Sequence, residues 1–119
     1  MRIEVKGRNV QVSDSIREHV AKRFEKVSRQ VSELAELEVE LSEERNPAIA
    51  ESKVAEATLH LKGVTLRAQD SSHDLLHAIN LCADEMAVQV KRHLEKRRKR
   101  REAREAAVPQ VPGDITPAA

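Results

Sequence analysis

Lysine and arginine are concentrated near the end of the chain, where their spacing suits the binding of phosphate groups. Residues 91–105 contain nine Lys or Arg and three Glu, a net charge of +6. The rest of the chain has twelve Lys or Arg and seventeen Asp or Glu, a net charge of −5. A cationic stretch of this kind is typical of a surface that binds a polyanion such as a nucleic acid. The alternative interpretation is a solvated helix end without a partner.

Two histidines raise the separate possibility of a metal site. His73 and His77 stand four residues apart in the string His-Asp-Leu-Leu-His, which is similar to a zinc-binding HExxH helix with Asp in place of Glu. However, the string lies at the start of a predicted helix and no third ligand is evident, because Cys82 points in another direction around the helix. We therefore predict no metal, no cofactor, no catalytic residue and no small-molecule substrate; the protein is not expected to be an enzyme.

Aromatic residues are almost absent, which restricts how a nucleic acid could be recognised. The chain has no Trp, no Tyr and one Phe. Proteins that read single strands stack bases on exposed aromatic side chains, whereas Phe24 falls on an apolar helical stripe and is expected in the core. A nucleic-acid partner would therefore be recognised by its phosphates and its shape. The single cysteine, Cys82, excludes an intrachain disulfide and is expected to be buried.

The chain has no stretch that resembles a signal peptide and no apolar run of membrane length. We expect a protein of the reducing cytoplasm with no membrane partner.

The cationic stretch is expected to form the end of one long helix over residues 72–104. Ser71 or Ser72 can cap its start, and Asp74 suits the positive end of the helix dipole. No Gly or Pro interrupts the segment. Apolar residues recur at spacings of three and four, which predicts one buried stripe: Leu75, Leu76, Ile79, Ala83, Met86, Val90 and Leu94.

A second amphipathic helix is predicted over residues 13–31. Either Ser13 caps this helix, or Ser15 does so with Glu18 in a capping box. Its buried stripe is expected to consist of Ile16, Val20, Phe24, Val27 and Val31. Lys22, Lys26 and Arg29 share another face by their spacing.

Alternating polar and apolar residues predict the strands. They cover residues 2–6, 36–42 and 53–62, and a fourth strand follows Gly63 to form a hairpin with the third. Glutamates occupy the outer positions of the second strand, which gives the sheet a solvated acidic face. The order β-α-β-β-β-α, with one apolar sheet face, predicts an α/β two-layer sandwich: a four-stranded mixed sheet with two helices on one face. We place the domain at residues 1–105 and expect a disordered tail at 106–119.

Two residue strings and the order of elements resemble the ribosome hibernation promoting factor family. The first string runs from Val5-Lys6-Gly7-Arg8-Asn9-Val10 into Ile16-Arg17-Glu18-His19-Val20; the second places Asp74 before Ala78-Ile79-Asn80 and Gln89-Val90-Lys91-Arg92. The resemblance covers about residues 1–100. It implies a fold like that of double-stranded-RNA-binding domains. It also implies binding to small-subunit rRNA over the mRNA and tRNA sites, which silences idle ribosomes in stationary phase or stress.

The resemblance also implies which positions face the rRNA. They are Arg8, Arg17, Arg23, Lys26, Arg29, Lys91, Arg92 and Lys96. From the cationic faces of the two helices we add Lys22, Arg97, Lys99 and Arg100 as RNA-binding candidates.

Some positions depart from the family pattern. Leu76 stands where the family often has Tyr, and Glu85 stands where it often has Lys. These changes shift the expected RNA contact from the middle of the last helix to its basic end. Long members of the family carry a C-terminal domain that pairs two ribosomes, and nothing after Ala106 could form one. If this is the whole protein, it resembles a short member of the family or the N-terminal domain alone of a long one, and pairing of ribosomes would need another hibernation factor as a partner.

A protein-interaction role is the alternative function. Relatives of this fold have been described as sigma-factor modulation proteins. Leu81 and Val88 are seven residues apart and are expected on the solvent side of the last helix, opposite its buried stripe. They would suit a contact with a partner helix.

Overall fold

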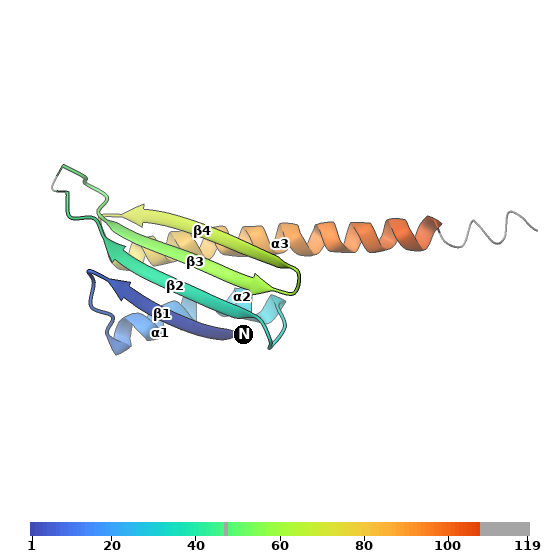
Figure 1. Ribbon diagram of the computed structural model, residues 1–119, viewed down its shortest axis with the longest axis horizontal. Helices are drawn as coiled ribbons and strands as arrows, with labels where there is room; N and C mark the ends of the chain where they lie inside the picture. Colours follow the sequence, from blue (N-terminus) through green and yellow to red (C-terminus); the bar gives the residue numbers. More distant parts are fainter. Residues whose placement is uncertain (47, 108–119) are drawn as a thin grey trace, which may run out of the picture.

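The chain folds into a four-stranded β-sheet with its helices packed against one face (Figure 1). The structure is a computed structural model and describes residues 1–46 and 48–107. Its elements, in order, are β1 (Arg2–Arg8), α1 (Asp14–Arg23), α2 (Glu25–Gln30), β2 (Glu36–Glu43), β3 (Lys53–Leu61), β4 (Val64–Ser72) and α3 (Leu75–Ala107). The predicted order of strands and helices is confirmed, with the first helical segment divided in two.

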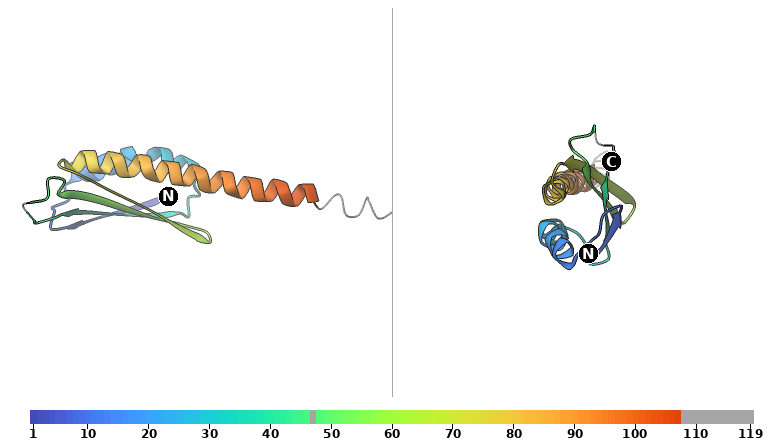
Figure 2. Two further views of the ribbon diagram at one scale, coloured as in Figure 1. Left: turned by 90° about the horizontal axis from the view of Figure 1, so that it is seen from above. Right: turned by 90° about the vertical axis from the view of Figure 1, so that its left-hand side faces the viewer.

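The sheet is mixed, and its strands lie side by side in sequence order. β1 pairs with β2 in parallel, with Arg2 opposite Glu36 and Arg8 opposite Ser42. The β2–β3 and β3–β4 pairs are antiparallel. A parallel pair needs a crossover connection, which α1 and α2 supply. Figure 2 shows these helices and α3 on the same side of the sheet, so the predicted two-layer α/β sandwich is confirmed.

Alternation along the strands separates a buried face from a solvated one. Leu37, Val39 and Leu41 of β2 are buried, while the glutamates between them are exposed. The helices cover this face with aliphatic side chains and with the one phenylalanine: Val20, Phe24, Val27, Ala78, Ile79, Ala83, Met86 and Val90.

Cys82 is also part of the core, as expected. It is fully buried, and its thiol donates to the carbonyl oxygen of Ala68 in β4 (3.5 Å). Burial is the main reason that the pKa of the thiol rises to about 12. The thiolate is therefore scarcely formed in the folded protein at neutral pH, and Cys82 acts as a small apolar residue.

A two-residue turn joins β3 to β4, and its geometry explains the glycine. Gly63 has a φ of +80°, in the left-handed region that a residue without a Cβ atom adopts readily. The predicted hairpin is confirmed, with Leu61 opposite Val64. Lys62 occupies the exposed tip beside Gly63.

The expectation of a single helix over residues 13–31 is wrong. Ser13 caps the start of α1, because its side chain accepts from the amide of Ile16 (3.2 Å). The helix is then interrupted at Phe24, whose ψ is 6°. Val20, Phe24 and Val27, which lie before, at and after the interruption, are all fully buried.

α3 begins at Leu75, three residues later than expected. Ser72 is still paired with Lys53 in the β-ladder, so strand pairing prevails over the serine capping signal. Asp74 caps the helix instead: its carboxylate accepts from the amide of Leu76 (3.2 Å), and its carbonyl oxygen accepts from the amide of Ala78 (3.0 Å).

The predicted buried stripe of α3 is correct in its middle and wrong at both ends. Leu76 and Leu94 are 42% and 37% exposed, while Ala78 and Cys82, which the predicted stripe omits, are fully buried. The apolar face is wide enough to include Ala78 and Cys82 where the helix crosses the sheet, and Leu94 lies beyond the last buried residue, Val90.

The helix continues to Ala107, so it includes the first two residues of the expected tail; residues 108–119 lie outside the described part of the chain. Among the described residues, no helix is both long and apolar enough to cross a membrane.

Candidate nucleic-acid interface

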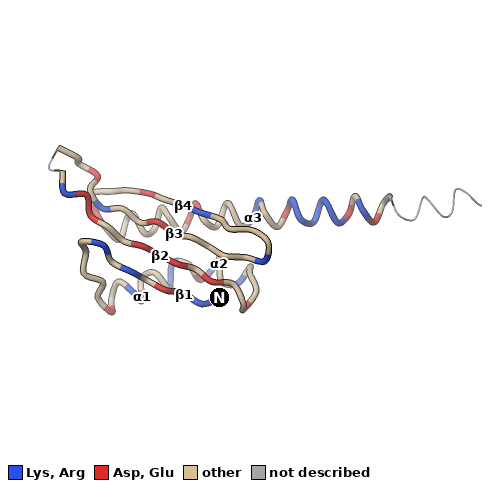
Figure 3. Tube along the Cα trace, viewed as in Figure 1, with Lys and Arg blue, Asp and Glu red and all other residues tan. Residues whose placement is uncertain are grey.

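The end of α3 projects beyond the sheet as a single helix, which we call the arm and define as residues 94–106. Every residue of the arm is exposed, and Figure 1 shows this part of α3 extending past the β3–β4 hairpin. Thirteen residues at 1.5 Å each correspond to about 20 Å of helix. Figure 3 shows Lys and Arg along much of its length. The arm therefore presents positive charge away from the core.

A groove lies where the arm leaves the sheet. It is open, has a volume of about 730 Å³, and runs between α3 and the tip of the β3–β4 hairpin. Its lining carries five Lys or Arg side chains, together with a histidine and an apolar floor: Lys62, Gly63, Val64, Leu66, Gln89, Arg92, His93, Lys96, Arg97 and Arg100. The structure thus brings together four predicted RNA-binding residues, namely Arg92, Lys96, Arg97 and Arg100.

The cations of the arm are largely free of acidic partners. Among the described residues, none of the six predicted cations of α3 lies within 4 Å of a carboxylate: Lys91, Arg92, Lys96, Arg97, Lys99 and Arg100. By contrast, Arg98 lies 3.7 Å from Glu102 and Arg101 lies 4.0 Å from Glu105. The six predicted cations of α3, like Arg104, therefore have no carboxylate partner that would compete with a phosphate.

The predicted cations of α1 and α2 are exposed, but three of them already have partners. The Lys26 ammonium lies 3.2 Å from Asp84 of α3, and the Arg29 guanidinium lies 2.7 Å from Glu25. Arg17 donates to the carbonyl oxygen of Val5 (3.3 Å). Lys22 and Arg23 are exposed, with no carboxylate within 4 Å among the described residues. The α1 and α2 positions therefore offer less free charge than the arm does.

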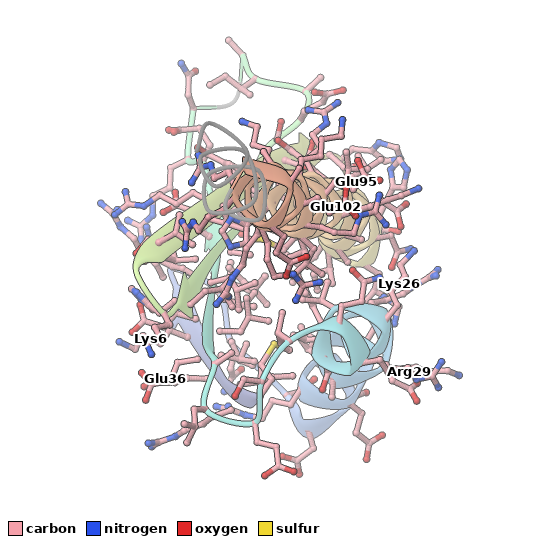
Figure 4. All side chains as sticks on the ribbon, turned by 90° about the vertical axis from the view of Figure 1, so that its right-hand side faces the viewer. Lys6, Lys26, Arg29, Glu36, Glu95 and Glu102 are labelled. Atoms are coloured by element: carbon pink, nitrogen blue, oxygen red, sulfur yellow. The ribbon has the colours of Figure 1, made fainter. Side chains whose placement is uncertain are left out.

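These cations do not form one patch with the groove. In Figure 4, Lys26 and Arg29 lie on one side of the molecule, and Glu95 and Glu102 of α3 lie on the same side. Arg8 ends β1, and Figure 1 shows that this end of the strand points away from the arm. Eleven of the twelve predicted residues thus divide among three regions: the arm and groove, the surface of α1 and α2, and the far end of β1. Lys91 lies on α3 before the arm and outside the groove lining.

Lys62 is the groove cation that sequence reasoning missed. It faces the arm only because the hairpin between β3 and β4 ends where α3 passes the edge of the sheet. The alternation of polar and apolar residues predicts where the hairpin turns. It does not predict which residues of α3 lie opposite that turn. A lysine beside the turn glycine is an ordinary solvated residue until that packing is known.

Two contacts fix α3 against the preceding helices. The imidazole of His19 and the side-chain amide of Asn80 form a hydrogen bond (2.8 Å), and Lys26 pairs with Asp84. The side chain of Gln89 donates to the carbonyl oxygen of Arg67 in β4, just before the groove. These bonds orient α3, and therefore the arm, relative to the sheet.

The histidine pair of the sequence motif does not form a metal site in this structure. Nδ1 of His77 is hydrogen-bonded to the hydroxyl of Ser72 (3.0 Å), and His73 is exposed. Across residues 1–46 and 48–107, no group of three or more His, Cys, Asp or Glu side chains could hold a metal ion.

The two apolar residues of the alternative interface are exposed, as expected. Leu81 is 36% and Val88 is 47% exposed. Continuing from Val88 in steps of seven residues leads to Glu95 and then Glu102, so this line along α3 changes from apolar to acidic. It lies opposite the buried face of the helix.

Two carboxyl groups face each other between β4 and α3. The side-chain hydrogen bond between Glu85 and Asp70 is the largest cause that raises the pKa of Glu85; partial desolvation and repulsion between the charges add to it. Both groups are acceptors when ionised, so this bond requires a proton. One oxygen of Asp70, Oδ2, is buried and has no partner within the described residues.

We expect Glu85→Gln to stabilise the fold at neutral pH, because a neutral amide can donate to Asp70 without repulsion. A raised pKa means that the folded chain binds the proton more readily than the unfolded chain does, so wild-type stability falls as the pH rises through that pKa. The advantage of the variant should therefore be larger at about pH 8 than at about pH 5 in urea unfolding followed by circular dichroism. Glu95→Gln, an exposed change on the same helix, is the control; an equal effect there would contradict the role of the Asp70 pair.

A model of the family described as sigma 54 modulation protein / S30EA ribosomal protein matches residues 3–98. A ribosome hibernation promotion factor from Picosynechococcus sp. is 32% identical over 97 residues, which cover 81% of this chain and 50% of that protein. The ribosome hibernation promoting factor of Azotobacter vinelandii is 28% identical over 112 residues, covering 94% of this chain and 100% of that protein. The chain thus spans about half the length of the first relative and the whole of the second.

Two solved structures share the fold. The N-terminal domain of Thermus thermophilus Protein Y has a TM-score of 0.68 and 30% identity, with 78% of this chain and 99% of that chain covered. A ribosomal subunit interface protein from Coxiella burnetii also has a TM-score of 0.68, at 20% identity, with 80% and 99% covered; at this identity the likeness concerns the fold alone. The family match ends at residue 98, so the last turns of the arm lie outside it.

Proposed function

The chain belongs to the sigma 54 modulation protein / S30EA ribosomal protein family, and from this premise we propose that it is a ribosome-associated translation inhibitor. It binds the rRNA of the small ribosomal subunit over the mRNA and tRNA sites and thereby silences idle ribosomes. Support for the ribosomal partner comes from relatives that are named ribosome hibernation promoting factors. The finer parts, namely the subunit, the rRNA and the blocked sites, follow from the resemblance set out in the sequence analysis.

The observation that supports RNA as the ligand is the cationic arm. It carries exposed Lys and Arg with few acidic partners on a domain whose only aromatic residue, Phe24, is fully buried. Such a surface can neutralise phosphates but cannot stack unpaired bases on aromatic rings. Affinity would then come from the release of counterions, which suits a rigid, folded RNA such as rRNA and makes the binding strongly dependent on salt.

The proposed activity is occupancy and needs no catalytic step, cofactor or small-molecule substrate. The protein would act in the cytoplasm, where ribosomes translate.

The test is co-sedimentation of the purified protein with vacant ribosomes and with isolated 30S subunits across a salt series. We expect one protein per 30S subunit, affinity that falls steeply and linearly on a logarithmic salt scale, and competition with initiator tRNA and mRNA. Absence of ribosome association even at low salt would refute the proposal. Binding that does not compete with tRNA or mRNA would refute the assigned location.

A second candidate function is modulation of a protein partner through Leu81 and Val88. The observation that favours it is their exposure on the solvent side of α3. Apolar contacts of this kind depend little on salt. Binding that persists at high salt and is lost when these two residues become polar would favour this function over RNA binding.

A further inference from the structure

The groove beside the arm is built by one continuous face of α3, whose chemistry changes where the sheet ends. Met86 and Val90 of this face are fully buried against the sheet. Steps of seven residues, close to two helical turns, lead from Met86 to His93 and Arg100. The same steps lead from Val90 to Arg97 and Arg104. The face that is apolar over the sheet is therefore continued by cations beyond it, at the same position around the helix.

The second wall of the groove comes from the hairpin. Lys62, at the tip between β3 and β4, lines the groove opposite the helix cations, and Val64 and Leu66 form an apolar floor. The bond from Gln89 to the Arg67 carbonyl oxygen holds α3 beside β4 at this point. The two walls thus have a fixed relation, and cations face the groove from both.

The opposite face of the arm has a different charge pattern. Glu95 and Glu102 continue the line of Leu81 and Val88, and Arg98 and Arg101 are paired with Glu102 and Glu105. Figure 4 shows Glu95 and Glu102 on one side of α3. Four of the six predicted α3 cations that have no acidic partner line the groove, whereas Lys91 and Lys99 do not.

Resting on the proposed function, we propose that this groove is a two-walled clamp for the sugar-phosphate backbone of RNA, with Lys62 on one wall and Arg92, Arg97 and Arg100 on the other. Arginine is suited to this because its planar guanidinium can donate two hydrogen bonds to one phosphate. The lining has no Phe, Tyr or Trp, so the clamp would hold the backbone and leave bases unread. The arm would thus enter the rRNA with its cationic face toward the backbone and its glutamates turned away.

The test compares two arginine pairs on the same turns of the same helix. Arg97→Gln/Arg100→Gln removes two charges from the groove lining. Arg98→Gln/Arg101→Gln removes two charges that are paired with Glu102 and Glu105 and do not line the groove; glutamine is tolerated in helices about as well as arginine. Lys62→Gln tests the hairpin wall, with Lys6→Gln on the open face of the sheet as its control. Affinity is measured for vacant 30S subunits and for a labelled RNA hairpin with a stem of about 16 base pairs.

We expect Arg97→Gln/Arg100→Gln to weaken binding to 30S subunits and to the RNA hairpin about tenfold or more. The slope of log affinity against log salt concentration should fall by about two, which corresponds to two lost phosphate contacts. Lys62→Gln should lower it by about one, while both controls change affinity less than about twofold. Equal losses from the two arginine pairs, or no loss from Lys62→Gln, would overturn the clamp. If the wild type binds the RNA hairpin but not 30S subunits, the proposed function fails, and the variants on RNA still decide the clamp. If the wild type binds neither the RNA hairpin nor 30S subunits, both proposals fail.

Discussion

Reversal of Lys91, Arg92 and Lys96 to glutamate is expected to abolish stable association with ribosomes. The change alters the net charge by six units where α3 leaves the sheet, and two of these residues line the groove. Each lost phosphate contact lowers the slope of log affinity against log salt concentration by about one. The new carboxylates also repel the phosphates of the RNA backbone. We expect at least a loss of about a hundredfold in affinity at about 0.1 M salt. The measurement is co-sedimentation of variant and wild type with 30S subunits across salt.

The fold should survive this reversal, because all three side chains are exposed. Unfolding of the variant by urea, followed by circular dichroism, would verify this. Leu81→Ser/Val88→Ser is the matched control on the solvent side of the same helix. A triple variant that still binds ribosomes at wild-type affinity would contradict the role of the basic helix end. Loss of binding only in the Leu81/Val88 variant would point to the protein-partner function instead.

Phe24→Ala is expected to cause the largest loss of stability of any substitution considered. Phe24 is fully buried at the interruption between α1 and α2, and it is the only aromatic residue of the chain. Replacing a buried Phe by Ala typically costs about 3–5 kcal/mol. The total stability of a single domain is about 5–15 kcal/mol. The variant should therefore unfold at a much lower urea concentration or be largely unfolded in water.

Phe24→Leu keeps an apolar side chain at this position and should lose less stability, about 1.5 kcal/mol or less. Leu34→Ala is the surface control: Leu34 is 91% exposed, so its truncation should change stability by less than about 0.5 kcal/mol. Circular dichroism is the suitable signal, because the chain has no Trp or Tyr to report unfolding by fluorescence. An unchanged urea midpoint for Phe24→Ala would show that the core does not depend on this side chain.

The strands of the sheet could be predicted because their alternation records burial directly. Leu37, Val39 and Leu41 alternate with glutamates, and only one register places the leucines and valine in the core. The helix limits were less predictable. Serine is a common helix-capping residue, but the conformation of Ser72 is set by its pairing with Lys53 in the sheet. This partner is distant in the sequence, so the local pattern does not reveal it.

The candidate site could be predicted in composition but not in arrangement. The charge of residues 91–105 and the exposure of the arm follow from the sequence, because the apolar stripe stops where the cations begin. The pairing of Lys26 with Asp84 and the position of Lys62 opposite Arg97 depend on how α2, α3 and the hairpin pack together. Such contacts between distant segments have no local signal.

The single buried thiol provides a means of following the motion of α3 in solution. A disulfide reagent can reach Cys82 only when the helix moves away from Ala68 of β4, so the rate of thiol exchange reports the frequency of that local opening. The arm has no packing partner of its own in the described chain, whereas Cys82 lies just over three turns before it on the same helix. Labelling kinetics with and without RNA would therefore distinguish ligand binding that leaves the base of α3 dynamic from binding that tightens the whole helix against the sheet.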